Sequence, residues 1–186
     1  MTDYLTRIVE GASAKQPPSG MTTRVIAIDG PGGAGKSSLA DQLAGALGGI
    51  PIVRTDDFAS WDDPLDWWPR LIEDVLEPLA RNQTARYRCT TWAETEQERW
   101  GEVAPSTFVI LEGVSASRKA FRPFLTYAIW IETPPDLRLR RGLERDGAEA
   151  RAQWEQWMRE EDDYVSRERP RENVDLILPG DQDLWS

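Results

Sequence analysis

A glycine-rich turn near the start of the chain has the residue types and spacing of a phosphate-binding site. The segment GPGGAGKS, residues 30–37, matches the pattern G-x-x-x-x-G-K-[ST]. Glycines at this spacing let the backbone curl tightly, so that its N–H groups surround a polyphosphate. The ammonium group of Lys36 would reach the β- and γ-phosphates, and the hydroxyl of Ser37 would bind Mg²⁺. The predicted nucleotide-binding residues are Gly30, Gly32, Gly33, Ala34, Gly35, Lys36, Ser37 and Ser38.

The segments on either side of this turn favour the same interpretation. A β-rich run over residues 24–29 precedes the turn, and a predicted helix over 36–47 follows it, with free N–H groups directed at the phosphates. The alternative is an ordinary glycine-rich turn with an exposed Lys36. The chain has no N-K-x-D guanine-binding motif, which weakens a GTPase interpretation, and its 186 residues fit a small kinase. We therefore expect ATP and Mg²⁺ as cofactors.

Acidic residues follow two of the predicted strands. Asp56 and Asp57 come directly after the strand predicted over 50–55, and Glu112 follows the apolar run FVIL. The carboxyl ends of parallel strands border the crevice where ligands bind. Asp56 is therefore the candidate general base for an attacking hydroxyl, and Glu112 is the candidate carboxylate that faces Mg²⁺ or the substrate. The alternatives are an Asx turn or a helix N-cap at Asp56 and a water-facing acid at Glu112.

Five arginines occur between Arg138 and Arg151 in an otherwise acidic chain. A kinase needs mobile cations that fold over the triphosphate, and arginine makes forked hydrogen bonds to phosphate oxygens. Arg141 and Arg145 lie one helical turn apart and are the candidate lid residues, expected to act in catalysis with Lys36 and Asp56. The alternative is a solvated helix face with i, i+4 ion pairs.

A tryptophan-rich insertion, residues 56–105, separates the second and third predicted strands. Flat indole rings can stack on a flat acceptor, and the chain has nine tryptophans. The candidate substrate-binding residues are Asp56, Phe58, Trp61, Tyr87, Arg88, Trp92 and Glu112. The alternative is that the rings pack the insertion against the sheet, which is the preferred interpretation for Trp68. Packing in the core is also the interpretation for Trp154 and Trp157.

The order of the elements predicts an α/β fold. Strands are predicted over residues 24–29, 50–55, 106–114, 127–132 and 174–178, and helices over 2–12, 36–47, 136–146 and 148–168, with a further helix in the centre of the insertion. Apolar strands separated by helices indicate a parallel five-stranded sheet covered on both faces. The expected organisation is an N-terminal helix and linker over 1–22 and a P-loop kinase domain over 23–186, with the acceptor-side insertion at 56–105 and the lid at 136–152.

Composition excludes several functions. With 22 Lys+Arg against 32 Asp+Glu, the formal net charge of −10 disfavours binding to nucleic acids and anionic membranes. The absence of histidine excludes Ser-His-Asp hydrolysis and most zinc sites. One cysteine, Cys89, cannot form an internal disulfide, which fits the reducing cytoplasm. No stretch approaches the roughly 18 apolar residues of a membrane helix.

The ordered segments IAIDGPGGAGKSSLA, TDDF, VILEGV and RLRRGLERD resemble the uridine kinase/nucleoside kinase family of P-loop kinases, and most closely its small bacterial uridine-kinase-like branch. The resemblance implies a nucleoside monophosphate kinase-like fold with a lid, and ATP-dependent phosphorylation of a hydroxyl on a nucleoside-like acceptor. It also implies that Asp56 is the general base, that Glu112 is the acidic residue at a strand end, and that Arg141 and Arg145 are lid arginines.

Two departures from the family pattern concern the acceptor. The family's acceptor-binding Asp is Thr91 in this chain, and a hydroxyl cannot hold vicinal ribose hydroxyls as a carboxylate does. Uridine kinases also use a histidine near the pyrimidine, which this chain lacks. Both departures weigh against uridine and leave the ATP site unaffected.

Three functions remain open from the sequence. The first is a kinase for a nucleoside-like small molecule, in the cytoplasm and with no nucleic-acid or membrane partner. The second is a nucleotide-binding regulatory module with little or no kinase activity. The third is a sugar or antibiotic kinase of the same fold. Assembly into a homo-oligomer is compatible with each of them.

Overall fold

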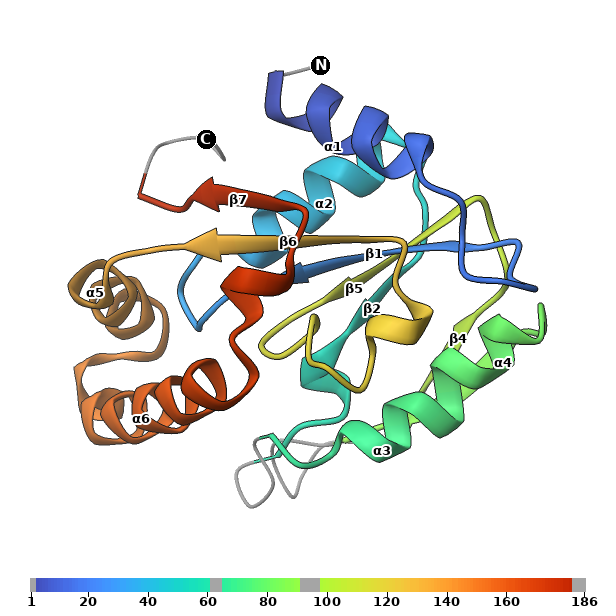
Figure 1. The fold of residues 1–186 in the computed structure, drawn as a ribbon. Coiled ribbons are helices and arrows are strands. Elements are labelled where there is room, and N and C mark those ends of the chain that lie inside the picture. Colours follow the sequence, from blue (N-terminus) through green and yellow to red (C-terminus); the bar gives the residue numbers. More distant parts are fainter. Residues whose placement is uncertain (1–2, 61–64, 91–97, 182–186) are drawn as a thin grey trace.

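The computed structural model describes residues 3–60, 65–90 and 98–181 and has an α/β architecture. Five parallel strands form one sheet in the order β2-β5-β1-β6-β7 (Figure 1). The strands are β1 (Arg24–Asp29), β2 (Ile52–Arg54), β5 (Phe108–Glu112), β6 (Tyr127–Glu132) and β7 (Leu176–Pro179). The predicted five-stranded parallel sheet flanked by helices is therefore confirmed.

The register of the sheet brings polar strand ends to one edge. Strand β1 pairs with β5 up to Ile28 opposite Glu112, and β2 pairs with β5 up to Arg54 opposite the same Glu112. On its other side, β1 pairs with β6 up to Asp29 opposite Trp130. The carboxyl ends of these strands therefore place Asp29, Arg54 and Glu112 at one edge of the sheet, where open parallel sheets bind their ligands.

Helices cover both faces of the sheet, which explains why its central strands are almost continuously apolar. Helices α1 (Asp3–Ala14) and α2 (Lys36–Ala46) lie on one face (Figure 1) and bury Ile8, Leu39 and Leu43 in one core. Helix α1 continues to Ala14, two residues beyond the predicted helix over 2–12. Its apolar side packs into the same core as the sheet.

The insertion covers the opposite face. Helix α3 (Trp68–Leu71), a π-helical turn (Ile72–Leu76) and helix α4 (Glu77–Ala80) follow one another without a break. The irregular turn ends two residues before Pro78, which has no N–H for a regular helical hydrogen bond. Val75 and Leu79 are buried in the second core, as their helical spacing predicts.

The insertion also contains an antiparallel hairpin that we did not predict. Its strands are β3 (Ala85–Cys89) and β4 (Arg99–Val103). Strand β3 alternates strictly, with Ala85, Tyr87 and Cys89 buried and the two arginines between them exposed. Five residues of alternation, with one Ala and one Cys as the inward positions, are too weak a pattern to distinguish a strand from a loop by sequence.

Two helices lie beyond the carboxyl ends of the strands (Figure 1). Helix α5 (Pro135–Asp146) ends at Gly147, which has a φ of 93°, and a 3₁₀ turn (Ala148–Ala150) leads into helix α6 (Arg151–Glu168). Both helices agree with the prediction, except that the 3₁₀ turn replaces the start of the second. The segment predicted to be a lid, residues 136–152, thus consists of nearly all of α5, the 3₁₀ turn and the first two residues of α6.

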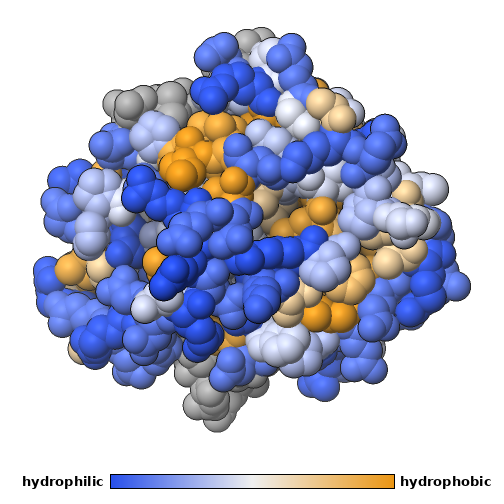
Figure 2. Space-filling view, viewed as in Figure 1, coloured by the Kyte–Doolittle hydropathy of each residue, from blue (hydrophilic) through white to orange (hydrophobic). Residues whose placement is uncertain are grey.

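Polar and charged residues cover most of the face drawn in Figure 2, with apolar residues gathered in smaller areas. Trp100 and Ile177 are the large hydrophobic residues with substantial exposure in the described part of the chain. Within that part, no helix combines the length and the apolarity that a membrane crossing requires.

Candidate active site

A cavity of about 690 Å³ opens at the carboxyl ends of the strands. One wall is the phosphate loop, residues 30–37, and the other is the end of α5 with the start of α6. The sequence-predicted residues that line it are Gly32, Gly33, Ala34, Gly35, Lys36, Ser37, Ser38, Asp56, Glu112, Arg141 and Arg145. The structure therefore brings together residues from the loop, two strand ends and the lid, which lie far apart in the sequence.

The phosphate loop takes its shape from its glycines. Gly35 precedes α2 with a φ of 100°, a left-handed conformation that L-residues rarely adopt. A Cβ atom on Gly33 would lie 2.7 Å from the carbonyl oxygen of Arg138, so a side chain there would push α5 away. The loop leads directly into α2, whose first N–H groups and positive dipole end favour an anion.

Lys36 lies in the position that its motif predicts. The residue is only 8% exposed, and its Nζ donates a hydrogen bond to the carbonyl oxygen of Pro31 at 2.9 Å. The ammonium group therefore folds back over the loop that it follows. A phosphate in the cavity would replace a neutral carbonyl partner with an anionic one, which makes a stronger hydrogen bond.

Glu112 is buried and already engaged with two donors. Ser37 Oγ donates to Glu112 Oε1 at 3.3 Å, and Arg54 Nη1 donates to Oε2 at 2.6 Å. Arg54 also pairs with Asp41 on α2. Burial raises the pKa of the Glu112 carboxyl, and the positive charges of Lys36 and Arg54 oppose that rise.

The contact between Ser37 and Glu112 fits a magnesium ion. Mg²⁺ in nucleotide sites takes one or two protein oxygens and completes its octahedron with phosphate oxygens and water. The described residues contain no group of three His, Cys, Asp or Glu side chains that could hold a metal by themselves. A hydroxyl beside a single carboxylate is therefore suited to a metal that arrives with a polyphosphate, as the sequence predicts.

Asp56 reaches the cavity from a 3₁₀ turn, Thr55–Asp57, that directly follows β2. The N–H groups of Phe58 and Ala59 both donate to the Thr55 carbonyl oxygen and fix this turn. Thr55 itself is buried against Gly113. Any side chain at position 113 would overlap the hydroxyl of Thr55. The exposed carboxylate of Asp56 therefore stands on a rigid support beside the phosphate loop.

The two lid arginines line the cavity and hold different partners. Arg141 Nη1 donates to the carbonyl oxygens of Gly33 at 3.3 Å and Gly180 at 2.8 Å. Arg145 makes a two-pronged pair with Asp146, at 2.7 and 2.8 Å, and the hydrogen bonds of this pair raise the pKa of Arg145. Arg141 thus contacts the phosphate loop directly, and Arg145 lines the same cavity from the end of α5.

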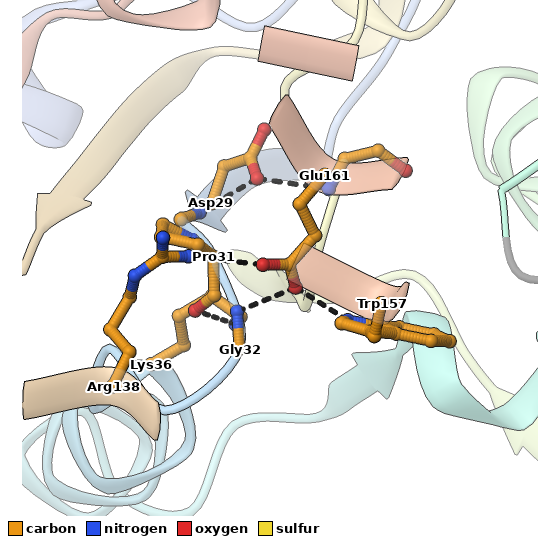
Figure 3. Close-up of polar contacts among 9 residues, drawn as sticks. Asp29, Pro31, Gly32, Lys36, Arg138, Trp157 and Glu161 are labelled. Atoms are coloured by element: carbon orange, nitrogen blue, oxygen red, sulfur yellow. Dashed lines mark hydrogen bonds and ion pairs between the residues drawn. The ribbon is translucent and has the colours of Figure 1, made fainter. Parts of the chain in front are cut away.

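Two further charged residues border the loop, and sequence reasoning did not select them for the site. Asp29 is fully buried at the end of β1, and its carboxylate accepts hydrogen bonds from Gly30 N–H, at 2.7 Å, and from the loop after β5. Glu161 on α6 accepts from Gly32 N–H at 2.7 Å and from Arg138 Nη1 at 3.0 Å (Figure 3). Trp157 also lines the cavity, although its predicted role was packing.

A signal for these residues was present in the sequence. Asp29 is a carboxylate that ends an apolar strand, which is the same argument that selected Asp56 and Glu112. Glu161 is a charged residue on the side of the predicted helix that carries Trp154 and Trp157. A charge in an apolar stripe is expensive to bury without a partner, so its position indicated a partner elsewhere in the fold.

Three predicted acceptor residues of the insertion, Phe58, Tyr87 and Arg88, do not line this cavity, whereas Asp56 does. Phe58 and Tyr87 are buried and stacked, with ring centroids 5.0 Å apart, and Arg70 lies over the Phe58 ring at 4.9 Å. Arg88 is exposed and pairs with Glu98. Trp61 and Trp92 lie outside the described residues. A second, smaller hollow of about 420 Å³ borders this part, and its lining residues are Phe58, Ser60, Asp66, Trp67, Pro69, Arg70 and Thr90.

Asp57 connects the Asp56 turn to the hairpin. Its carboxylate pairs with Arg99 at 2.5 Å, and its carbonyl oxygen accepts from Thr90 N–H at 2.6 Å. Burial, reinforced by the nearby Asp57, raises the pKa of the Tyr87 hydroxyl to about 12. Burial likewise raises the pKa of the Cys89 thiol. Adjacent carboxylates, Asp56 and Asp57, thus serve different parts of the molecule.

Comparison with known proteins shows similarity at the level of structure alone. No family model and no curated protein sequence matches the chain. A solved structure described as a possible uridine kinase from Bacillus stearothermophilus is 20% identical, with a TM-score of 0.68 over 95% of this chain and 97% of that one. The "putative fructose transport system kinase" of Silicibacter sp. TM1040 is 21% identical, with a TM-score of 0.62 over 96% of this chain and 100% of that one. The chain therefore shares the α/β fold of these two structures, built on the five-stranded parallel sheet that its sequence predicts.

Proposed function

We propose that the protein is an ATP-dependent small-molecule kinase that transfers the γ-phosphoryl group to a hydroxyl of a nucleoside-like acceptor. The observation that carries this proposal is the composition of one cavity. It joins the phosphate loop, a carboxylate on a rigid turn, a Ser–Glu pair suited to Mg²⁺ and two arginines. A kinase needs all four features, and a protein that only binds nucleotide does not need Asp56 to face the loop.

In the proposed reaction, Asp56 orients the acceptor hydroxyl and takes its proton. The hydroxyl oxygen forms a bond to the γ-phosphorus as the bond to the β–γ bridging oxygen breaks, and ADP leaves with that oxygen. Lys36, the loop amides, Arg141 and Arg145 stabilise the charge on the moving phosphoryl group. Ser37 and Glu112 would hold Mg²⁺, Glu112 partly through water, and the ion would supply neutralisation of charge on the phosphates when bound. Positioning accounts for most of the rate enhancement in such a transfer.

The acceptor is the open part of the proposal. The names of the two structural neighbours point to different acceptors, a nucleoside in one and a fructose transport system in the other. A sugar or antibiotic kinase of the same fold therefore remains the alternative.

The single cysteine, Cys89, is a buried free thiol, which supports placing this activity in the reducing cytoplasm.

A nucleotide-binding regulatory module is a second candidate, favoured by one observation. Phe58 and Tyr87, which the sequence assigns to the acceptor, are buried in the insertion and leave the cavity without them. The position of Asp56, which is exposed and lines the cavity beside the loop, favours the kinase.

The deciding experiment is ATP consumption measured over a panel of nucleosides, sugars and vitamins, with Mg²⁺ present. A kinase gives acceptor-dependent formation of ADP with matching phosphorylated product. A regulatory module binds Mg²⁺-ATP in calorimetry but gives no acceptor-dependent turnover. If titration with Mg²⁺-ATP produces no heat, the nucleotide site itself is refuted.

A further inference from the structure

Helix α6 lies along the outer side of the phosphate loop. Three residues on one side of the helix contribute to this contact: Trp157, Glu161 and Tyr164. Tyr164 donates a hydrogen bond to Asp29 Oδ2 at 2.7 Å, and Glu161 accepts from Gly32 N–H at 2.7 Å. One helix therefore grips the loop at two points, just before its first glycine and at its third residue.

The contacts with α5 and α6 involve backbone groups of the loop, at Gly32 and Gly33. The N–H group of Gly32 donates to Glu161, and the carbonyl oxygen of Gly33 accepts from Arg141 on α5. A tight curl directs some peptide groups toward its centre and others away from it. The Gly32 N–H belongs to the peptide unit 31–32 and the Gly33 carbonyl oxygen to the unit 33–34, so the two contacts fix the orientation of the peptide units on either side of the Gly32–Gly33 pair.

The Glu161 carboxylate is itself held in place. It is 1% exposed, and both oxygens have donors (Figure 3). Oε1 accepts from Gly32 N–H and Trp157 Nε1, and Oε2 accepts from Arg138 Nη1. Arg138 lies on α5 and passes so close to the loop that a Cβ atom on Gly33 would lie 2.7 Å from the Arg138 carbonyl oxygen. Glu161 therefore joins the loop, α5 and α6 at one point.

We propose that Glu161 is a positioning residue for phosphoryl transfer, which holds the phosphate loop in its phosphate-binding shape from outside and links that shape to the α5–α6 pair. Glu161 acts through the Gly32 amide and through Arg138, without contact to the nucleotide. The proposal rests on the proposed function, because the value of the shape is to bind a triphosphate. It predicts that loss of Glu161 weakens nucleotide binding.

The opposite role for the same contact makes the proposal testable. A buried carboxylate beside Lys36 could instead compete with the phosphates for the loop. Removal of Glu161 would then tighten nucleotide binding. The sign of the change in affinity distinguishes the two roles, and no assay of the unidentified acceptor is needed.

The experiment compares Glu161→Ala, Glu161→Gln and the control Glu155→Gln. Glu155 is an exposed acid on the same helix, paired with Arg151 at 3.5 Å. Glutamine keeps an oxygen for the Gly32 amide but turns an N–H group toward Arg138. We expect the dissociation constant for Mg²⁺-ATP to rise by about 10- to 100-fold in Glu161→Ala, by about 3- to 10-fold in Glu161→Gln, and not at all in the control.

Amide hydrogen exchange provides the second readout. Peptides covering residues 30–36 should exchange faster in Glu161→Ala, while peptides covering β5 and β6 keep their protection. A purely structural role would instead speed exchange throughout the core. An unchanged or tighter affinity in a folded Glu161→Ala protein, or unchanged exchange in the loop, overturns the proposal. If this variant does not fold, the affinity of Glu161→Gln decides in the same way. If the wild-type protein does not bind Mg²⁺-ATP, the proposed function is refuted. Hydrogen exchange in the loop then still tests whether Glu161 holds the loop in its shape.

Discussion

The cavity beside the phosphate loop and the insertion, residues 56–105, differ in how their side chains are packed. The phosphate loop and its surroundings form a hollow lined by backbone amides and by charged groups with defined partners, such as Lys36 and Glu112. The insertion is filled by rings, with Phe58 between Trp67 and Tyr87 at centroid distances of 5.9 and 5.0 Å. The first region is a hollow lined by polar groups, and in the second, aromatic rings pack beside the Thr55–Asp57 turn.

The boundary between these regions runs between two neighbouring residues. Asp56 faces the cavity, and Asp57 faces the hairpin, where it pairs with Arg99. Both leave the same strand end, so the rigid insertion determines how accurately Asp56 is placed. The comparison teaches that chemistry in the cavity and stability in the insertion should respond to different mutations.

The mutation expected to have the largest effect on the cavity is at Lys36. Replacement by methionine keeps the length of the buried stem and removes the ammonium group. We expect turnover to be abolished and Mg²⁺-ATP affinity to fall about 10- to 100-fold, because a charged partner of the phosphates is lost. Calorimetry and the ADP assay measure both effects. Lys119→Met, at an exposed position, is the control. Wild-type affinity in Lys36→Met would remove the loop from the nucleotide site.

The next largest effect distinguishes the adjacent carboxylates Asp56 and Asp57. Asp56→Asn should lower kcat by about 10²- to 10⁴-fold and leave Mg²⁺-ATP affinity nearly intact, because the substitution removes a general base but no contact to the phosphates. Asp57→Asn should leave kcat near the wild-type value and lower the free energy of unfolding by about 1–2 kcal/mol, through its hydrogen bonds. Its partner Arg99 is 68% exposed, which limits that loss. Steady-state kinetics and urea unfolding test the pair, and full activity of Asp56→Asn on the true acceptor would refute the assignment of the base.

A stability effect without a nucleotide effect is expected at Phe58. The ring is 2% exposed, so Phe58→Ala leaves a cavity and should cost about 3–5 kcal/mol of unfolding free energy. Phe58→Leu keeps most of the volume and should cost less than about 1.5 kcal/mol. Neither should change the dissociation constant for Mg²⁺-ATP. A folded Phe58→Leu protein with weakened ATP binding would show that the two regions are not separate.

The same contrast explains what the sequence could predict. A phosphate loop is specified by backbone geometry, so its glycines, Lys36 and Ser37 identify the site without knowledge of the fold. Strand-end carboxylates such as Asp56 and Glu112 follow from the rule for parallel sheets. Aromatic residues carry no such rule, because a ring that would stack on a ligand fits a core equally well. Phe58 and Tyr87 were therefore assigned to the acceptor, although the structure buries them away from the cavity.

Contacts between distant elements were beyond the sequence for another reason. Glu161 meets Gly32 across 129 positions, and only the packing of α6 beside the loop brings them together. The hairpin of β3 and β4 depends on pairing as well, since neither short strand has a strong pattern of its own.

The smallest expected effect concerns pH and belongs to the insertion alone. The folded protein raises the pKa of Tyr87 from 10.0 to about 12 because burial disfavours the phenolate. A group with a raised folded pKa contributes full stability below its unfolded pKa and loses it as pH rises through the folded value. Wild-type protein should therefore lose stability between pH 10 and 12 more steeply than Tyr87→Phe, which cannot ionise there. Urea unfolding at pH 8.5 and pH 10.5 measures the difference, from which the titrations shared by both proteins cancel. Equal losses in the two proteins would contradict the burial that raises the pKa of Tyr87, and with it the packing of its ring against Phe58 beside the Asp56 turn.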